Sequence, residues 1–498
     1  MITINIPYKN LFFWSLFLGC IPITATAQKM PDTLYLSLKQ TIEIAIDNSP
    51  SVLQAKTQKE TSYWDWKTFK SDYLPQLSLD GNLPNFSKDN LPITQPDGSI
   101  DFLSVNNINS RVGLSLNQEI PLTGGSISVN SSLARFDNLT NDFRRYNATA
   151  VSIRLNQPLF AYNRLLWNKK IEPLKFEESK KKFVEDKEAT SLGTTIRYFN
   201  LLISQSNYQI AKTNFENYKL LFKIDSTRYD LGTVSKQQLL QIQLQVVNAK
   251  KRMSQANLGK KTATLDLLEY IGYNDLQKNQ ALILKVPSDI PPIQVDEEIA
   301  LKEAMENRAD ITAYKRRLLE AESQLARVKA ENGFNAELTM SLGLTNADSE
   351  FQNLYTNTQD QQTISLGFRI PIADWGRSKS RLKRAQLRKD LEKQSVDLET
   401  SNFKREIITE VDRFEMYKQQ VIIAYESSNI AKMSYNISKN KFILGKESST
   451  NLNVALNEKD QAIQDYIVSL SDFWEAYYRI RLLTIYDFET SKSLTQIK

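Results

Sequence analysis

Hydrophobic and polar residues alternate strictly in four short segments of this chain. The segments are VGLSL at 112–116, ISV at 127–129, VSIRL at 151–155 and ISLGFRI at 364–370. A period of two places successive side chains on opposite faces of a β-strand, so each segment predicts a strand. Polar residues on the second face are typical of an outer-membrane strand, and a soluble sandwich gives the same pattern. Aromatic residues near the predicted strand ends favour the membrane setting: Phe160, Tyr162, Trp167 and Trp375.

Apolar residues spaced by three and four predict long helices in the rest of the chain. There is no proline between Pro173 and Pro287, nor after Pro371. Residues 377–444 could therefore form one helix of roughly 100 Å, at 1.5 Å per residue. The apolar spacing is that of a coiled coil, and we interpret these side chains as core. They are Leu239, Ile242, Val246, Ala249, Met253 and Ala256 in one segment, and Ile463, Tyr466, Leu470, Phe473, Tyr477 and Ile480 in another.

A turn motif occurs twice between helical segments. RYDLG ends at Gly232 and KFILG ends at Gly445, and a short link containing Ser or Thr follows each. Glycine adopts the left-handed conformation that ends many helices without steric cost. Each motif therefore predicts the turn of a helical hairpin, one near residues 231–235 and one near 444–448.

The spacing of these landmarks predicts an internal two-fold repeat. Pro158 and Pro371 are 213 residues apart, and so are Gly232 and Gly445. The segments around Ala45 and Ala304 also resemble each other, but they are 259 residues apart, which leaves 46 extra residues in the first half. We expect a first repeat at 28–286 with an added β-hairpin at about 87–133, partly a long external loop from 87 to 110. The second repeat would cover 287–498, with strands at about 336–372.

The N-terminus is typical of a targeting segment. Lys9 precedes the apolar run LFFWSLFLG, and Ala25-Thr26-Ala27 follows. These features predict a signal peptide at 1–27 that is cleaved after Ala27. A lipoprotein signal cleaved before Cys20 is the alternative. No later segment has 18 consecutive apolar residues, so we expect an exported chain without a membrane-spanning helix.

Composition excludes several kinds of chemistry. The 498 residues include no histidine and one cysteine, and the formal net charge is +6. Histidine-based catalysis, His/Cys zinc sites and a disulfide within the chain are therefore excluded. We expect no enzyme, no catalytic residue, no metal and no cofactor. The nearly balanced charge of an exported chain also argues against a nucleic-acid partner.

A few strands per chain would leave open sheet edges, which lipid does not tolerate. If the strands lie in the membrane, several chains must share one barrel. The element order, the paired Leu-Gly turns, LSLKQTIEIAIDNSPSV at 36–52 and IPIADWGRSKSRLKRA at 370–385 resemble the TolC-like outer-membrane efflux proteins. The resemblance covers essentially the whole mature chain. It implies a mainly α fold with β-strands, in which a homotrimer forms a long α-helical coiled-coil barrel below a shared transmembrane β-barrel.

The resemblance implies a passive duct of a tripartite efflux or type I secretion system, in the bacterial outer membrane and extending into the periplasm. Its partners would be a periplasmic adaptor (membrane fusion) protein, an inner-membrane transporter of RND or ABC type and outer-membrane lipid. An exported soluble coiled-coil scaffold or adaptor protein is the alternative. The exported substrate stays open, and so does the strand number: four per chain would give twelve in a trimer, and six would give eighteen.

Site residues follow from the resemblance, position by position. In the family the Leu-Gly turns form the periplasmic tip, where the adaptor docks. Rings of aspartate narrow the tip of well-known members six and nine residues after the second glycine; here Asn451 and Val454 occupy those positions. The docking candidates are Leu231, Gly232, Thr233, Val234 and Ser235, with Leu444, Gly445, Lys446, Glu447 and Ser448. The expected strand-exit turns contain Pro158, Pro371, Trp375 and Gly376.

Overall fold

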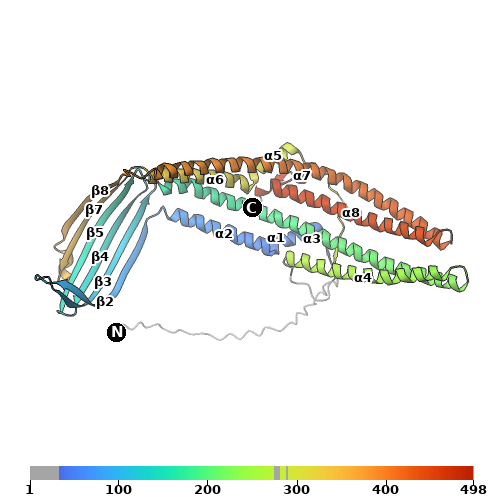
Figure 1. Cartoon of the computed structure of the whole chain (residues 1–498), viewed down its shortest axis with the longest axis horizontal. Coiled ribbons are helices and arrows are strands. Elements are labelled where there is room, and N and C mark those ends of the chain that lie inside the picture. The colour runs from blue at the N-terminus through green and yellow to red at the C-terminus, as the bar shows by residue number, and fades with distance from the viewer. Residues whose placement is uncertain (1–32, 274–280, 288–289, 497–498) are drawn as a thin grey trace, which may run out of the picture.

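The chain is long and bent, with a β-sheet at one end and two helical hairpins reaching to the other (Figure 1). A computed structural model describes residues 33–273, 281–287 and 290–496. The predicted signal peptide at 1–27 and the alternative cleavage site at Cys20 lie outside the described residues.

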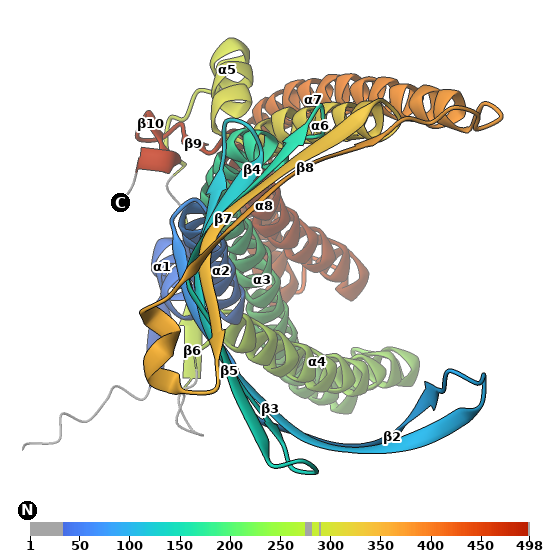
Figure 2. The same ribbon diagram turned by 90° about the vertical axis from the view of Figure 1, so that its left-hand side faces the viewer.

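Six antiparallel strands form one curved sheet, which Figure 2 shows from the sheet end of the molecule. Their order in the sheet is β2-β3-β4-β5-β7-β8. Strands β2 and β8 are therefore the two edges within the described chain. The strands are β2 (Gln76–Thr94), β3 (Ile100–Ile120), β4 (Gly125–Asn138), β5 (Phe143–Leu159), β7 (Asn335–Asp348) and β8 (Gln359–Arg369), with the short helix η1 (Phe351–Tyr355) between the last two.

The stretch 87–110 is not the long external loop that we expected. Most of it lies in β2 and β3, which pair in register up to Thr94 and Ile100. The turn between them is short: the Gln95 N–H donates to the Ser99 carbonyl at 2.8 Å. The expected hairpin range of 87–133 contains parts of β2, β3 and β4. Asn, Ser, Asp and Pro in this stretch indicate a loop by composition, but cross-strand pairing overrides such weak local preferences.

Four long helices form the layer that reaches to the tip. α3 packs against both α4 and α8, and α8 packs against α7, so the order across the layer is α4, α3, α8, α7. α3 and α7 each have 67 residues, whereas α4 has 35 and α8 has 36. The internal repeat and a coiled-coil supercoil stay predictions. The helices are α3 (Arg164–Asp230), α4 (Lys236–Tyr270), α7 (Arg377–Ile443) and α8 (Ser449–Thr484).

Two shorter helices complete this layer next to the sheet. α2 and α6 both pack against α3, and α6 also packs against α7. Ser49 caps α2, and Pro50 occupies the first position of the helix. The N–H at that position has no partner within a helix, so proline, which has no N–H, fits there without loss. α2 leads into β2, β5 into α3, α6 into β7 and β8 into α7, so four helices meet the sheet. The two helices are α2 (Pro50–Ser71) and α6 (Ala309–Glu331).

The main hydrophobic core lies midway along the molecule. Phe414, Phe473 and Tyr477 are buried where α7 and α8 meet, and Tyr198 and Phe199 are buried on α3. The Tyr198 hydroxyl donates to the Lys285 carbonyl at 2.5 Å, which ties α3 to a small parallel sheet. Around this core lie β1 (Thr33–Leu36), β6 (Ala281–Leu284), α1 (Leu38–Asn48), α5 (Glu297–Asn307), β9 (Tyr486–Asp487), β10 (Lys492–Ser493) and η2 (Leu494–Gln496).

A buried cluster of charged groups fixes the C-terminal segment against α3. Arg481 is 3.0 Å from Glu188 and 3.3 Å from Asp487. Burial raises the pKa of Asp487, but the Tyr477 hydroxyl and the Arg481 charge lower it more, so the net pKa lies below 3.8. Ionised Asp487 therefore stabilises the fold above its unfolded-state pKa, and this contribution is lost as the pH falls through the lower folded-state value.

A second buried carboxylate shows the opposite shift. Glu185 on α3 lies 3.1 Å from Arg308 and accepts the Ala309 N–H at 2.8 Å, so it joins α3 to the start of α6. Burial raises the pKa of Glu185, and the Arg308 charge offsets this only in part. Its ionised form is therefore less favourable in the folded chain, and stability from this group falls as pH rises above 4.5.

Candidate functional site

The first Leu-Gly turn joins α3 to α4 at the far end of the molecule from the sheet (Figure 1). Gly232 has a φ of +72°, in the left-handed region that favours glycine. Its N–H donates to Tyr229 and the Thr233 N–H donates to Arg228, each at 2.9 Å. This pair of bonds satisfies the last carbonyls of α3 in a Schellman motif. Ser235 then accepts the Gln238 N–H and begins α4.

The second turn repeats this geometry between α7 and α8. Gly445 also has a φ of +72°. Its N–H donates to Phe442 at 3.0 Å, and the Lys446 N–H donates to Lys441 at 2.9 Å. Ser448 caps α8 by accepting an N–H three residues ahead. The two turns thus have the same backbone hydrogen bonds, the same glycine conformation and the same kind of serine cap.

The residues of both turns lie mostly at the surface. Leu231 and Leu444 are 72% and 70% exposed, although leucine is usually buried. The other docking candidates are exposed, except for Val234 and Glu447, which are half-buried. The ten candidates therefore form two exposed turns, which we call the tip turns.

A small core behind the tip turns holds the two hairpins together. It contains Tyr218 from α3 and Leu452 and Leu456 from α8. The Tyr218 hydroxyl donates to Asn453 at 3.0 Å, and Asn214 donates to Asp460 at 2.5 Å. These contacts cross between the α3–α4 and α7–α8 hairpins and fix one tip turn relative to the other. Sequence reasoning missed these polar partners, because residues separated by more than two hundred positions show no local signal.

The constriction candidates lie on the exposed side of α8. Asn451 is exposed and its side-chain N–H donates to Glu447 at 2.7 Å. Val454 is 51% exposed, whereas its neighbour Leu452 is buried in the small core. Asn451 and Val454 are three positions apart and so share one helix face. The structure thus brings these two residues together on a face that is open within this chain.

The strand-exit residues divide into two groups. Pro371, Trp375 and Gly376 lie in the link between β8 and α7. Pro158 instead lies inside β5, opposite Glu337 of β7. The pairing of β5 with β4 ends at Asn156 in the described register, so β5 is locally an edge at Pro158. An edge accepts a residue that has no N–H to donate.

Polar side chains that sequence reasoning missed fix the junction between strands and helices. Asp374 accepts the Ser378 N–H at 2.8 Å and the Gly376 N–H at 3.1 Å, which caps α7. Hydrogen bonds from the Ser378 side chain and, second, from its N–H are the main causes that lower the pKa of Asp374. Asn163 caps α3 and also donates to the Pro121 carbonyl at 2.9 Å. An Asn or Asp just before a helical run is a recognisable cap signal that could have identified both.

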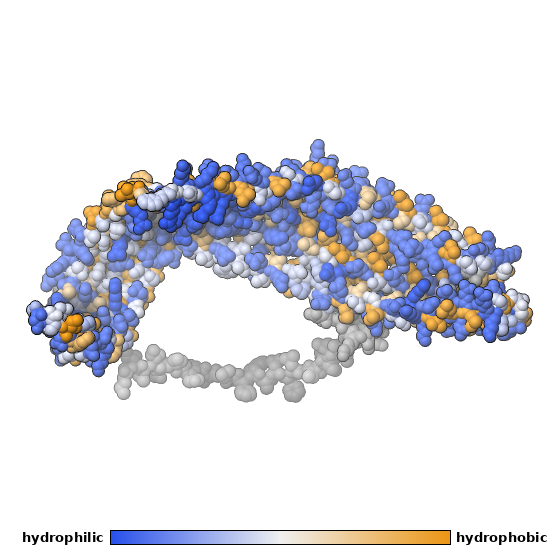
Figure 3. All heavy atoms as spheres, in the orientation of Figure 1, coloured by the Kyte–Doolittle hydropathy of each residue, from blue (hydrophilic) through white to orange (hydrophobic). Residues whose placement is uncertain are grey.

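Apolar side chains are exposed on the two outermost helices of the layer. Figure 3 shows hydrophobic residues scattered among polar ones over the helical part of the surface. More than half of the surface of each of these residues is exposed within the described chain, and exposed apolar surface of this kind is typical of an interaction face. These residues include Leu240, Leu244 and Val247 on α4, and Ile423, Ile430, Met433 and Ile437 on α7.

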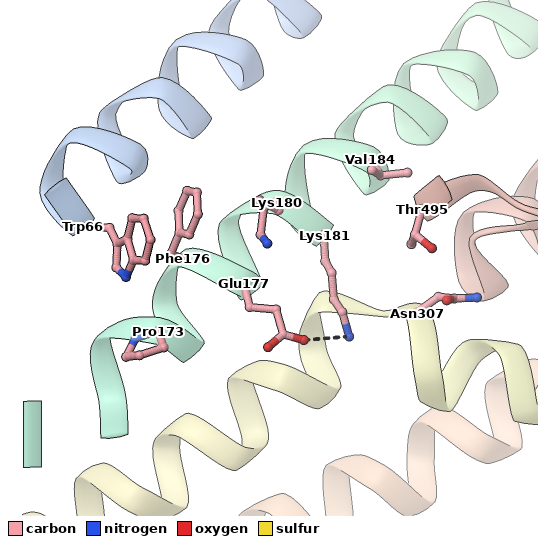
Figure 4. Close-up of a pocket in the computed structure, with 9 residues that line it drawn as sticks. All are labelled: Trp66, Pro173, Phe176, Glu177, Lys180, Lys181, Val184, Asn307 and Thr495. Carbon is pink, nitrogen blue, oxygen red and sulfur yellow. Dashed lines mark ion pairs between the residues drawn. The ribbon is translucent and has the colours of Figure 1, made fainter. Parts of the chain in front are cut away.

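A cleft of about 540 Å³ lies between α2, α3 and the C-terminal segment (Figure 4). The Trp66 ring stacks on Phe176 at 4.9 Å on one side of it. Lys181 lies 3.7 Å from Glu177 and also donates to the Glu306 carbonyl. The Lys181 ammonium and the Glu177 carboxylate are therefore paired with each other. The lining contains no second carboxylate close to Glu177 that could share acid–base work. The cleft therefore does not have the geometry of an active site.

Among the described residues, no group of three or more acidic, Cys or His side chains could hold a metal ion. The helices in that part of the chain also include none that is both long and apolar enough to cross a bilayer.

The structure is a mixed helix-and-strand protein. It combines long helical hairpins, which end in exposed tip turns, with a sheet that has two open edges within the described chain. The family model for outer membrane efflux proteins matches residues 41–273 and 300–484. The chain therefore belongs to the outer membrane efflux protein family. Proteins of this family are passive channels and not enzymes.

Solved structures share the fold across nearly the whole chain. The Campylobacter jejuni CmeC outer membrane channel is 17% identical, with a TM-score of 0.64 over 90% of this chain and 85% of that one. A membrane protein from Pseudomonas aeruginosa is 15% identical, with a TM-score of 0.63 over 92% of each chain. The open-state Neisseria gonorrhoeae MtrE outer membrane channel is 14% identical, with a TM-score of 0.59 over 90% and 88%. A comparison with curated protein sequences finds no match.

Proposed function

We propose that three copies of this chain form a passive export duct that spans the outer membrane and extends into the periplasm. The sheet end would lie in the membrane, and the tip turns would meet a periplasmic adaptor protein coupled to an inner-membrane transporter. The duct would serve a tripartite efflux pump or a type I secretion system. The observation that carries the proposal is the pair of matching exposed tip turns at the end opposite the open-edged sheet.

Three further observations support this arrangement. The exposed apolar side chains of α4 and α7 lie on the two lateral faces of the helical layer, where a neighbouring copy would cover them. The sheet has one open edge on each side, and open edges in lipid need partners. The family consists of channels, which favours the duct over the exported soluble scaffold.

Fractionation of expressing cells tests the duct directly. We expect the chain in the outer-membrane fraction as a trimer that migrates as a monomer in mild detergent only after heating. A soluble periplasmic monomer would contradict the proposal and favour the scaffold.

Changing both exposed tip leucines, Leu231→Asp together with Leu444→Asp, should abolish export while leaving the trimer intact. Neither side chain packs in the small core, so the fold does not need it. An interface residue that acts as a hot spot contributes about 2 kcal/mol or more, which is about 30-fold in affinity, and a charge at an apolar contact adds the cost of burying it. The measurement is made in the source bacterium, with the variant in place of the native protein. It determines sensitivity to compounds that become more toxic when the gene for this protein is deleted.

A matched control is Ile299→Asp, which introduces the same charge at an exposed residue of α5, far from the tip. This variant should export normally. Equal loss of export in the control and the tip variant, or normal export in the tip variant, would argue against adaptor docking at the tip turns.

The native channel should show weak or absent block by multivalent cations at its tip. Asn451 and Val454 carry no charge, so a ring of them offers no carboxylates to hold a cation. Asn451→Asp combined with Val454→Asp should create block of single-channel current in planar bilayers, and Asn451→Gln with Val454→Asn should not. Strong block of the native channel at micromolar concentrations of a trivalent cation would show that another site closes the tip.

A further inference from the structure

Two of the six strands in the sheet connect to no helix. Four helices meet the sheet, and they connect to β2, β5, β7 and β8. β3 and β4 are instead joined directly to each other through residues 121–124, on the side of the sheet that faces the helices. They form an inserted hairpin between the strand that follows α2 and the strand that precedes α3.

The inserted hairpin is anchored at its helix-side turn. The Asn163 side chain, which caps α3, donates to the Pro121 carbonyl at 2.9 Å. Gln118 donates to the Tyr73 carbonyl at 3.0 Å, just after α2. The Gly124 N–H donates to the Ile120 carbonyl at 2.8 Å and closes the turn. The hairpin is therefore held to the helical layer at both flanks.

One face of the sheet is apolar across the inserted hairpin and its neighbours alike. A row of directly paired residues runs over five strands, and a second row runs over four. Each row contains large apolar side chains, and most of them are exposed in the single chain. The first row is Leu77, Leu116, Val129, Ile153 and Leu342, and the second is Ile127, Leu155, Met340 and Ile364.

The opposite face is polar along the same strands. A row of paired residues crosses all six strands without one large apolar side chain. Apolar residues on one face and polar residues on the other are the pattern of a wall between lipid and a water-filled lumen. The inserted hairpin shares this pattern and its register. The polar row is Gln76, Asn117, Ser128, Arg154, Ser341 and Thr363.

The two sheet edges have the directions that a closed ring requires. β2 starts at Gln76 beside the helices and runs away from them, whereas β8 ends at Arg369 on returning to them. In a ring of identical chains, β8 of one copy would therefore lie antiparallel to β2 of the next, like every other pair in the sheet. An even number of strands per chain makes this possible.

We infer that three copies close an eighteen-stranded barrel, six strands from each, with the inserted hairpin as part of its wall. The occupant of each open edge is thus a second copy of this chain. The inference rests on the trimer proposed above, and it replaces a barrel built from only the four strands that connect to helices.

The perimeter of the barrel favours eighteen strands. Strands about 4.8 Å apart and tilted by about 40° each occupy about 6 Å of perimeter, so eighteen give about 110 Å and twelve about 75 Å. Twelve helices, four per chain, spaced about 9 Å apart have a perimeter of about 110 Å. An eighteen-stranded barrel therefore matches the width of the helical tube, and the outer-membrane segment is not the narrowest part of the duct. Bulky cargo that passes the tip would also pass the membrane.

Cysteine cross-linking between copies distinguishes the two barrels. In the eighteen-stranded barrel, cysteines in β8 (Ile364→Cys, Leu366→Cys or Phe368→Cys) should form disulfides with cysteines in β2 (Leu77→Cys or Leu79→Cys). The same β8 cysteines should not react with β4 cysteines (Ile127→Cys or Val129→Cys), since three strand spacings, about 14 Å, exceed the reach of a disulfide. If the hairpin of β2 and β3 lay outside a twelve-stranded barrel, β4 would be the edge and the pattern would reverse. If instead the inserted hairpin of β3 and β4 lay outside, β2 would lie beside β5 of its own chain, and Leu77→Cys would form a disulfide with Ile153→Cys. The six-stranded sheet holds those two positions three strand spacings apart, so this disulfide should not form in the eighteen-stranded barrel.

The readout is covalent dimer and trimer on heated, non-reducing gels of the outer-membrane protein. Each single-cysteine variant serves as a control, because the native chain already contains Cys20. The scan over several β8 positions covers the possible registers. Cross-links from β8 to β2 in most of the protein are expected. Cross-links to β4, or to neither strand in an intact trimer, would overturn the inference, whereas absence of the unheated trimer itself would overturn the proposed function.

Discussion

Arg481→Met should lower the free energy of unfolding by about 3–5 kcal/mol, because it leaves buried carboxylates without their cation. Arg481 forms two hydrogen bonds with Glu188, at 3.0 and 3.1 Å, and a third with Asp487. The side chains of Arg481 and Glu188 are only 16% and 7% exposed, so water cannot replace the lost contacts. The thermal midpoint of the far-ultraviolet circular dichroism of the detergent-solubilised protein measures the effect.

Arg479→Met is the matched control, because it makes the same substitution two positions away on α8. Arg479 is 44% exposed and lies 3.9 Å from Glu410, which Arg413 already pairs at 2.6 Å. Loss of this half-exposed, more distant cation leaves Glu410 paired and should cost about 1 kcal/mol or less. The double variant Arg481→Met with Glu188→Leu should recover part of the loss, because it removes a buried charge. Equal midpoints for Arg481→Met and Arg479→Met would show that the buried cluster does not stabilise the fold.

Phe473→Ala should cost about 3–5 kcal/mol, the usual range for removing a fully buried aromatic ring. Phe473 is 0% exposed, and its ring centroid lies 5.3 Å from Phe414 and 5.4 Å from Trp474. These rings join α7 to α8 in the main core, so the cavity would lie between the two helices. The same thermal midpoint reports the loss.

Two controls separate the cavity from a general effect of substitution. Phe473→Leu keeps most of the volume and should cost about 1.5 kcal/mol or less. Tyr35→Ala removes a ring that is 55% exposed and should change the midpoint little. A midpoint for Phe473→Ala no lower than that for Phe473→Leu would mean that the core collapses around the missing ring.

The long helices of the structure could be predicted from local signals in the sequence. The expected helix from 377 to 444 corresponds to α7 at Arg377–Ile443. Gly232 and Gly445 end their helices because the left-handed conformation is cheap only for glycine, and the serine caps restart the next helices. Such signals act within five or six residues, so they can be recognised without knowing the fold.

The sheet shows where local signals are insufficient. The polar stretch at 87–110 resembles a loop in composition, yet its backbone pairs in β2 and β3. Pro158 predicts the end of a strand, yet it lies within β5 because β4 has already ended beside it. In both places the deciding partner lies in another strand, and composition contains no information about that partner.

The sequence by itself determined the helical hairpins, their tip turns and the resemblance to the outer membrane efflux family, because each depends on short-range patterns. Only the tertiary structure decided that six strands form one sheet, with β2 and β8 as its open edges. It also decided that Arg481 meets Glu188 across 293 positions of the chain. Strand number and buried ion pairs depend on contacts between distant segments, and folding brings those segments together only when the whole chain packs.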